Sequence, residues 1–473
     1  MIKYFFSFDS SKHIAEVQII FPSNTKNSLE INLPAWRPGR YQLQNFAKNI
    51  LNFEAFDGSN NPLEWRKTSR NVWKVENESQ REVTVKYKYY STELNAGGSF
   101  VDQYLNYINP VNACMFLPEL MDSPIQLQIS KTESDKIASG LTVNEDKDKF
   151  IIDIKDTYEL FDNPFIVSPY LERLEFRVQN VDFSFWIHGR IDIDTKQLIA
   201  DLTKIADYQI TLFGEFPEKN YHFMLIVPEH TYYHGVEHAN STMMVLGENG
   251  VLPNNYYNDL LGLASHELFH AWNIAKIRPV ELTPYDFTKE NYFETCFVAE
   301  GFTTYYGDKV LFESGAIDQK QYIKELETTY RRHFEEANET SQSILETSFD
   351  LWVDGYEKGT PGKKASVYSK GAVVAQILDL IIKKNTNQEK SLDNVMRILW
   401  DKFGKTGIGY SYQDVKAICE DVNGDSLEEY FNICIESGGS IFELLASLLT
   451  EKGVSLQFTA SRSVQLSIQT PNH

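Results

Sequence analysis

The sequence predicts an α+β protein in which an amino-terminal all-β domain precedes a small sheet and a helical bundle. Three observations lead to this class. Residues 1–170 read as short strands separated by turns, residues 171–250 mix strands with one helix, and the chain after residue 255 is mostly amphipathic helix. With 473 residues, 42% of them hydrophobic, the chain can bury a large core and divide into several domains.

The amino-terminal region shows the patterns of β-strands. Alternating or apolar segments occur at Ile14–Phe21, Glu82–Tyr90 and Phe150–Ile154. Clusters rich in Gly and Asn, at residues 57–62 and 95–98, separate such segments, because both residue types tolerate the positive φ of tight turns. We therefore expect a β domain over residues 1–170.

One turn of this domain carries a large aromatic residue between two prolines. Residues 34–41 read Pro-Ala-Trp-Arg-Pro-Gly-Arg-Tyr. The prolines stiffen the backbone, and a tryptophan at such a corner usually packs inward. We interpret the segment as a structural corner that buries Trp36 rather than as a direct substrate contact.

The middle and carboxyl-terminal regions predict a mixed sheet and then helices. We expect strands at 181–188 and 222–227 and a helix at 195–214. Amphipathic stretches follow at 256–274, 291–315, 318–337, 366–384, 391–404 and 425–450. The polar segment Ser341–Lys364 is expected to be a surface loop near the functional site. The predicted domains are 1–170, 171–440 and a helix and strand segment at 441–473.

Charge and cysteine content exclude several classes of protein. The net charge is −21, so binding to nucleic acid or to anionic lipid is not expected. The four cysteines form no Cys-x-x-Cys pair, and we interpret them as reduced core residues. No apolar run is long enough to cross a bilayer, so we expect no membrane insertion. The expected location is the cytoplasm, or the periplasm if a signal peptide has been removed.

The strongest chemical signal is the pentapeptide His266-Glu267-Leu268-Phe269-His270 in a predicted helix. Residues four apart share a helix face, so both imidazoles can bind one zinc ion while Glu267 reaches the water bound to it. The same pattern also occurs by chance in helices whose histidines are merely solvated or packed. The pentapeptide therefore indicates a metal site but needs a further ligand to support it.

A catalytic zinc site needs a third protein ligand and an open position for water. The acidic candidates downstream are Glu281, Glu290, Glu294 and Glu300. Glu300 is favoured because it stands in an apolar and aromatic helix, where an unpaired carboxylate would be costly to bury. The alternative is a Glu300 carboxylate paired with Lys276 or Arg278.

The residues also indicate how such a site would act. Zinc lowers the pKa of its water, so Glu267 can take the proton and pass it to the leaving amine. The oxyanion needs a further donor, and Tyr368 at the start of another helix is one candidate among 26 tyrosines. Asn273 is a candidate for a hydrogen bond that orients a metal ligand. His238 is a candidate for orienting the neighbouring Glu237, although a purely structural hydrogen bond is an equal alternative.

Five motifs together resemble those of the glycyl aminopeptidase family. His266–Pro279 reads HELFHAWNIAKIRP and is similar to the family's zinc helix. His234–His238 resembles its Gly-Gly-Leu-Glu-His element, Ala299–Thr303 its third-ligand motif and Tyr368–Gly371 its Tyr-x-Lys-Gly element. Residues 34–41 are similar to a Trp-x-Pro-Gly-x-Tyr motif in the family's β domain. The resemblance extends over nearly the whole chain.

The resemblance implies a thermolysin-like catalytic domain with one zinc ion per chain, held by His266, His270 and Glu300. It implies removal of amino-terminal residues, with small ones such as Gly or Ala preferred, and it supports Glu267 as general base and Tyr368 as oxyanion donor. A two-His, one-carboxylate site suits zinc, although cobalt or manganese could replace it.

The resemblance also assigns a substrate-binding strand. Gly235 and Val236 would lie along the substrate, and the Glu237 carboxylate would pair with its free α-ammonium group, which an internal peptide bond does not offer. One position of this strand departs from the family: His234 replaces the usual first Gly and can crowd the entrance or change the pocket for the first side chain. Thr304 stands where thermolysin-like enzymes often have an Asp that supports a ligating His.

We therefore expect a zinc aminopeptidase whose partners are peptides with a free amino terminus. Family members commonly continue into a PDZ domain, which we do not expect residues 441–473 to form. The alternatives are a zinc endopeptidase and a non-catalytic peptide-binding protein on the same fold. The complete set of two His, two Glu and one Tyr disfavours the last. The sequence leaves the oligomeric state open.

Overall fold

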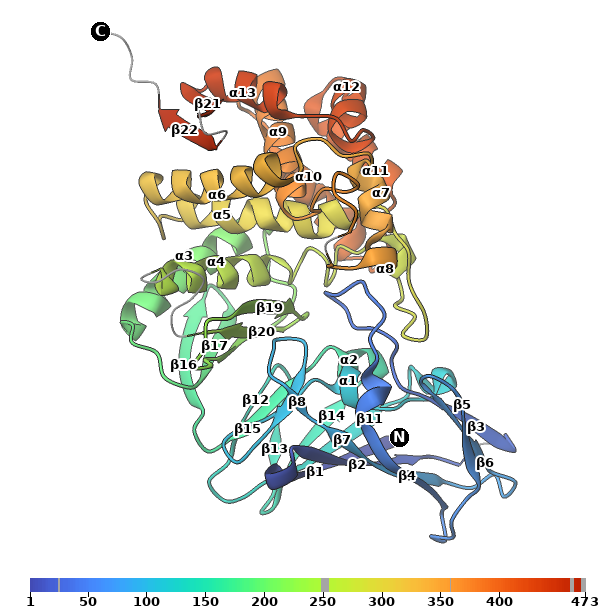
Figure 1. Cartoon of the computed structure of the whole chain (residues 1–473). Coiled ribbons are helices and arrows are strands. Elements are labelled where there is room, and N and C mark those ends of the chain that lie inside the picture. The colour runs from blue at the N-terminus through green and yellow to red at the C-terminus, as the bar shows by residue number, and fades with distance from the viewer. Residues whose placement is uncertain (24–25, 248–254, 358, 460–462, 469–473) are drawn as a thin grey trace. The chain divides into compact units, whose positions relative to one another are not determined.

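The computed structural model describes residues 1–23, 26–247, 255–357, 359–459 and 463–468 (Figure 1). The chain forms two compact units, which we call the β unit and the helical unit. The β unit comprises Met1–Ile193, Glu218–Leu260 and Asp286–Glu290, and the helical unit comprises Asp194–Pro217, Leu261–Tyr285 and Asn291–His473. The α+β class is confirmed. The small sheet groups with the amino-terminal strands, so these units differ from the predicted domains, whose boundaries stay a prediction.

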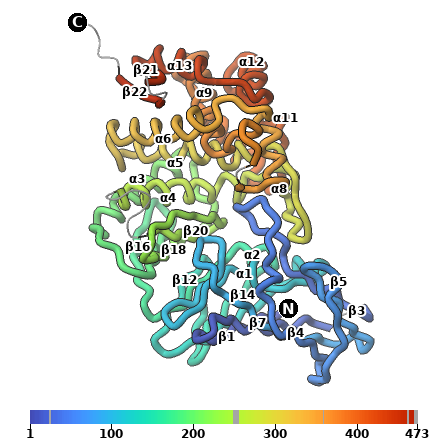
Figure 2. Tube along the Cα trace, viewed as in Figure 1, coloured from blue at the N-terminus to red at the C-terminus, as the bar shows by residue number. Residues whose placement is uncertain are grey.

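The amino-terminal strands form three sheets. The largest has the order β13 (Asn144–Glu145), β14 (Lys149–Ile154), β11 (Ile125–Ser130), β1 (Ile2–Asp9), β2 (Ile14–Phe21), β7 (Val83–Tyr90) and β4 (Ile50–Asp57). A second has the order β12 (Lys136–Ser139), β15 (Phe165–Ser168), β10 (Asn106–Ile108), β9 (Ser99–Val101) and β8 (Thr92–Glu93). The third consists of β3 (Ser28–Asn32), β6 (Val72–Glu76) and β5 (Trp65–Ser69). Figure 2 traces β1, β7 and β4 of the largest sheet.

Side-chain alternation explains why these segments are strands. In β7, Val83, Val85 and Tyr87 are buried while Thr84 and Lys86 between them are partly exposed, as the period-2 pattern requires. The three strands predicted in this region are confirmed as β2, β7 and β14. Two short helices, α1 (Pro110–Ala113) and α2 (Thr157–Phe161), lie in the connections.

The small sheet of the β unit has five strands. Its order is β16 (Glu172–Val178), β17 (Val181–His188), β18 (Asn220–Ile226), β20 (Ser241–Leu246) and β19 (Tyr233–Glu237). β17, β18 and β20 are parallel, and β16 and β19 are antiparallel edge strands. One face packs against the second amino-terminal sheet, since Trp186, Met224 and Val236 share a core cluster with Tyr107 and Ile166. The predicted strands at 181–188 and 222–227 are confirmed, whereas β16 and β20 were not anticipated.

The helical unit begins with α3 (Thr195–Phe213). The Asp194 carboxylate caps this helix by accepting the Lys196 and Gln197 amides, and Gly214 ends it at φ +90°. The main helices that follow are α4 (Tyr256–Phe269), α5 (Thr303–Glu313), α6 (Gln319–Ala337), α9 (Ser369–Asn385), α10 (Leu392–Leu399), α11 (Tyr412–Asn423) and α13 (Phe442–Thr450). The first turn of α4 groups with the β unit. α5, α6 and α9 pack against one another, and α5 and α6 run side by side in Figures 1 and 2.

Shorter elements complete this unit. Three π-helical turns are η5 (Phe297–Phe302), η6 (Trp400–Gly404) and η7 (Phe431–Ile435), and α12 (Glu428–Tyr430) precedes the last of them. Strands β21 (Val454–Phe458) and β22 (Val464–Ile468) pair as an antiparallel hairpin beside α13 and α6. The expected helix and strand segment after residue 441 thus contains one helix and two strands within the described residues.

Two predictions in the helical unit were wrong. The segment 341–364 was expected to be a loop, yet it contains α7 (Ile344–Phe349) and α8 (Leu351–Asp354), and a capping box between Ser343 and Glu346 starts α7. The continuous helix expected at 425–450 is broken before α13. The backbone of Gly438 lies so close to Thr340 that an added Cβ would approach its carbonyl oxygen to 1.9 Å, a path that a helix cannot follow. Helix α11 was not predicted.

The cysteine prediction is confirmed, since Cys114, Cys296, Cys419 and Cys434 are all buried and free. Among the helices of the described residues, none combines the length and the apolar character needed to span a membrane.

Candidate metal centre

The two histidines of the pentapeptide converge at the carboxyl end of α4. His266 lies in the last turn of this helix and His270 directly follows it, so the four-residue spacing brings their side chains to one side. Their Nε2 atoms are 3.0 Å apart. Two imidazole nitrogens this close cannot both carry a proton, which is the arrangement expected of ligands that share one cation.

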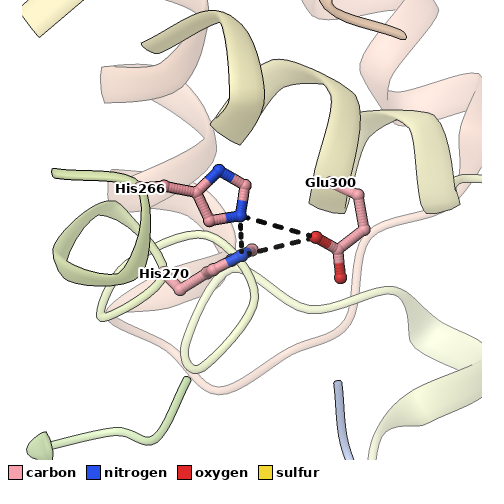
Figure 3. Close-up of side chains that lie close together, drawn as sticks. All are labelled: His266, His270 and Glu300. Carbon is pink, nitrogen blue, oxygen red and sulfur yellow. Dashed lines mark hydrogen bonds and ion pairs between the residues drawn. The ribbon is translucent and has the colours of Figure 1, made fainter. Parts of the chain in front are cut away.

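Glu300 completes the group from a different element. It lies in the π-helix η5, a type of turn that is often found at functional sites. Its Oε2 atom is 3.4 Å from His270 Nε2 and 3.9 Å from His266 Nε2 (Figure 3). Donor atoms bound at about 2.0 Å in a tetrahedron lie about 3.3 Å apart, so the three atoms fit one zinc ion.

Burial and charge also suit a cation at this point. Burial, and then the neighbouring His270, hold the pKa of His266 well below its usual range, so this imidazole is neutral, as a metal ligand must be. The side chains of His270 and Glu300 are 2% and 3% exposed. A buried carboxylate beside the neutral His266 ring gains from a positive charge, and a divalent ion would supply it.

Asn273 contacts both His270 and the segment that carries Glu300. Its backbone carbonyl lies 2.6 Å from His270 Nδ1, which leaves Nε2 free to bind a metal. Its side-chain amide donates to the Val298 carbonyl at 2.8 Å and to Thr303 Oγ1 at 3.1 Å, on both sides of Glu300. The suggested supporting role of Asn273 is therefore met by contacts in the structure, and a backbone carbonyl takes the place of the missing Asp at position 304.

Thr304 has a different task, because its hydroxyl donates to the Glu300 carbonyl at 2.8 Å. Of the competing partners proposed for Glu300, Arg278 packs on the Tyr285 ring at 4.0 Å. Of the acids in the described part of the chain, Glu300 is the one whose carboxylate groups with both histidines within 4.8 Å. Glu281 and Glu294 instead lie near each other, since Glu294 adds to the effect of burial in raising the pKa of Glu281.

Glu267 lies close to His270. Its side chain is buried, with the residue 4% exposed, and a carboxylate oxygen lies within 4.8 Å of a His270 ring nitrogen. A carboxylate at this range is within reach of a water that also contacts the metal position.

Tyr368 is placed by a close crossing of η5 and α9. Gly301, next to Glu300, touches Gly371 in the first turn of α9, and a Cβ added to Gly301 would lie 2.4 Å from the Gly371 Cα. Tyr368 directly precedes α9 and is partly exposed. Both glycines belong to the recognised motifs, but their mutual contact was not anticipated from the sequence.

The predicted substrate strand is β19, an edge strand of the β unit. Gly235 and Glu237 alternate with His234 and Val236, so the two pairs lie on opposite faces of the sheet. The Val236 side chain belongs to the core cluster, and its backbone faces Met243 of β20, with its carbonyl also accepting the Thr242 hydroxyl at 3.0 Å. His234 shares the Val236 face of the strand and lies close enough to Arg37 and Arg40 for their charges to lower its pKa. His238 Nδ1 lies 3.0 Å from the Asp162 carboxylate, a structural pair.

The corner at residues 34–41 is structural in the way predicted for Trp36. This side chain is fully buried, its indole donates to the Asp286 carbonyl at 2.7 Å, and its ring stacks on Phe287. The same corner also contains Gly39, whose Cα lies against the Glu237 carboxylate. Sequence reasoning missed this contact, which only the folded chain reveals.

Comparisons with known proteins agree with this fold and this site. A model of the Peptidase M61 N-terminal domain matches residues 3–169, and a model of the M61 glycyl aminopeptidase matches residues 259–374. None of the curated proteins compared matches the chain. These matches include the β domain and the segment that carries His266, His270, Glu300 and Tyr368.

Solved structures extend the agreement to almost the whole chain. A crystal structure of an aminopeptidase N family protein from Idiomarina loihiensis has a TM-score of 0.90 and 30% identity, and the match covers 97% of this chain and 79% of that chain. An M1 zinc metallopeptidase from Deinococcus radiodurans has a TM-score of 0.56 and 13% identity over 92% of this chain and 93% of that chain. A mutant of the Deinococcus enzyme bound to a Tyr-Ser-Ala substrate gives the same values.

The fold and the family models define a metallo-aminopeptidase, a hydrolase that acts on peptides. The thermolysin-like character expected of the catalytic part agrees with the helical region that follows the β-strands. The chain belongs to the M61 glycyl aminopeptidase family.

Proposed function

We propose that this protein removes small amino-terminal residues such as Gly or Ala from peptides, with one zinc ion held by His266, His270 and Glu300. The observation that carries the proposal is the convergence of two Nε2 atoms and one Oε2 atom at 3.0 to 3.9 Å from two separate helices. The preference for small residues rests on the family. A zinc ion in this group would polarise the scissile carbonyl and lower the pKa of a bound water toward neutral.

Residues of the chain would then transfer the proton of the attacking water and stabilise the negative charge on the substrate carbonyl. Glu267 accepts the proton of the attacking water and delivers it to the leaving amine. The Tyr368 hydroxyl donates a hydrogen bond to the oxyanion that develops on the substrate carbonyl. Asn273 keeps the His270 ring oriented through its carbonyl.

Recognition of the amino terminus is assigned to β19. We propose that the backbone of Gly235 and Val236 pairs with an extended substrate along the strand edge, as in β-strand addition. Glu237 would pair with the α-ammonium group and so select free amino termini. Support comes from the burial of Glu237, which is 7% exposed, because a buried carboxylate gains most from a charged partner.

A panel of amino-acid arylamides, with free or acetylated amino groups, tests this proposal. Glycyl and alanyl arylamides should be cleaved, their acetylated forms should not, and a chelator should abolish cleavage until zinc is restored. Glu237→Ala should lower kcat/KM on free substrates about 100-fold or more. Glu175→Ala, in an exposed ion pair with Arg173 on β16, is the control and should change it little. Cleavage of acetylated substrates, or full activity of Glu237→Ala, would favour an endopeptidase instead.

A further inference from the structure

Residues Arg37–Arg40 of the β unit form a tight turn. The Arg40 amide donates to the Arg37 carbonyl at 3.3 Å, and Gly39 has a φ of +73°. Proline in the second position and a glycine with positive φ in the third are the signature of a type II β-turn. The residue types therefore dictate the shape of this turn, and only glycine takes the third position without strain.

The Glu237 carboxylate lies directly against this glycine. A Cβ added to Gly39 would be 2.5 Å from Oε2, 3.0 Å from Oε1 and 3.1 Å from Cδ of Glu237. Such distances mean that any side chain at position 39 must displace the carboxylate. Two independent reasons, backbone conformation and space, thus require glycine here.

The turn itself is rigidly attached. The buried Trp36 indole donates to the Asp286 carbonyl, and the Ala35 amide donates to the Phe287 carbonyl at 2.8 Å. On the other side, the Arg37 guanidinium lies on Gly97, where an added Cβ would approach it to 2.1 Å, and donates to the Pro38 carbonyl. These contacts fix the residues that lead into the turn, which limits how far Gly39 can move away from Glu237.

Glu237 is also fixed from the strand side. It is the last residue of β19 and pairs in register with Thr242 of β20. His238, the next residue, is held by Asp162, which also accepts the Ala239 amide at 3.0 Å. The carboxylate is therefore confined between a paired strand and the turn.

We propose that Gly39 is a positioning residue for Glu237, and that the Pro38–Gly39 turn fixes this carboxylate in the orientation that receives the substrate's α-ammonium group. This inference rests on the proposed function of Glu237. It gives the amino-terminal β strands a direct part in selecting free amino termini. A site that binds an ammonium group gains from such confinement, since less ordering remains to be done when the substrate arrives.

The turn carries two arginines, whose charges reach the neighbouring His234. Burial, and then Arg37 and Arg40, lower the pKa of His234 to about 3. The imidazole is therefore neutral and adds no positive charge beside the strand that offers Glu237 to a cation.

A double-mutant cycle on the full chain tests the proposal. Gly39→Ala should raise KM for glycyl and alanyl arylamides and lower kcat/KM by about 10- to 100-fold, with zinc content unchanged. Gly453→Ala is the matched control, because Gly453 has a φ of +74° and nothing within 4 Å of an added Cβ. It carries the same backbone strain without the contact and should leave kcat/KM unchanged.

The decisive comparison is made in the Glu237→Ala background. There the carboxylate is gone, so adding Gly39→Ala should change kcat/KM by less than about two-fold. An equal loss in both backgrounds, or full activity of Gly39→Ala, would overturn the inference while leaving the proposed function intact. Full activity of Glu237→Ala alone would overturn both. If Gly39→Ala does not fold, Gly39→Asn replaces it, since asparagine tolerates positive φ but still meets the carboxylate.

Discussion

The burial of Glu300 is the residue-level fact from which the metal centre follows. Its carboxylate lies 3.4 Å from His270 Nε2 and 3.9 Å from His266 Nε2, with the residue itself 3% exposed. Burying an ionised carboxylate without a counter-charge costs several kcal/mol, so the arrangement is stable only with a cation or a bound proton. The positions of Glu267 and Asn273 around it indicate a metal site rather than a structural acid.

Glu267→Gln tests the general base. The amide keeps the shape of the side chain but cannot accept a proton, so kcat should fall by about 100- to 10,000-fold. Zinc content should match that of the unmodified protein, because Glu267 is not proposed as a ligand. The rate of alanyl arylamide hydrolysis gives kcat, and metal analysis of the same sample gives the zinc content. A variant that keeps more than a tenth of the turnover would contradict the assignment.

Asn273→Ala tests the support of the ligands. Loss of the side-chain bonds to Val298 and Thr303 should loosen η5 and weaken zinc binding by about 10- to 100-fold. Competition with a coloured chelator measures this affinity. Asn385→Ala is the control, because it removes a comparable amide bond, 3.1 Å long to Asn423, at the opposite end of α9. Equal zinc affinity in the two variants would show that Asn273 has no such role.

At the scale of elements, the crossing of η5 and α9 sets the geometry of the site. Gly301 and Gly371 allow the two backbones to touch, which brings the start of α9 next to the third ligand. This contact gives a physical reason for a glycine after Glu300 and another three residues after Tyr368. Larger residues at either position would separate the elements that carry the two side chains.

The far part of α9 is held by a buried carboxylate. Asp379 accepts from Tyr305 in α5 and from Lys383 at 2.7 Å each, and from the Leu392 amide that starts α10 at 2.8 Å. Burial alone would raise the pKa of Asp379, but Lys309 and Lys383 outweigh it, so the pKa lies below its usual range. The ionised carboxylate therefore connects three helices of the unit.

Asp379→Asn should lower the free energy of unfolding at pH 7 by about 3 kcal/mol, because it leaves buried donors and a lysine without their anion. A depressed pKa stabilises the fold above the unfolded value near 4, and this contribution is lost as the pH falls through the folded pKa. The difference between variant and parent should thus shrink below about pH 4. Urea unfolding at several pH values measures it.

The control for this prediction is Asp401→Asn, whose exposed pair with Lys405 should contribute less than about 1 kcal/mol. A difference for Asp379→Asn that grows on acidification would contradict the assigned charge state.

At the scale of the whole molecule, the sequence was sufficient for the class, the family and most of the longer helices, but for only a minority of the strands. Local period predicted β2, β7, β17 and α3, since these elements depend on their own side chains. A helix face and a buried acid made the grouping of His266, His270 and Glu300 predictable, and their role as metal ligands stays a prediction. The motif resemblance then identified the family that the comparisons show.

What the sequence did not predict depends on contacts between distant segments. The break before α13 comes from Gly438 meeting Thr340, and the Gly39 contact with Glu237 joins residues almost 200 positions apart. Helices α7 and α8 were missed because they have only six and four residues and lie in a segment whose remainder is polar and rich in Gly. His234 and Glu237 lie on opposite faces of β19, and the expected effect of His234 on the entrance or the pocket stays a prediction.

The most direct measurement of the central claim is anomalous diffraction at the zinc absorption edge from crystals of the purified protein. We predict one strong peak per chain, within bonding distance of His266 Nε2, His270 Nε2 and Glu300 Oε2. Crystals of Glu300→Gln, soaked first in chelator and then in zinc, should lack this peak. Zinc bound elsewhere, or no peak between these three side chains in active protein, would contradict the account.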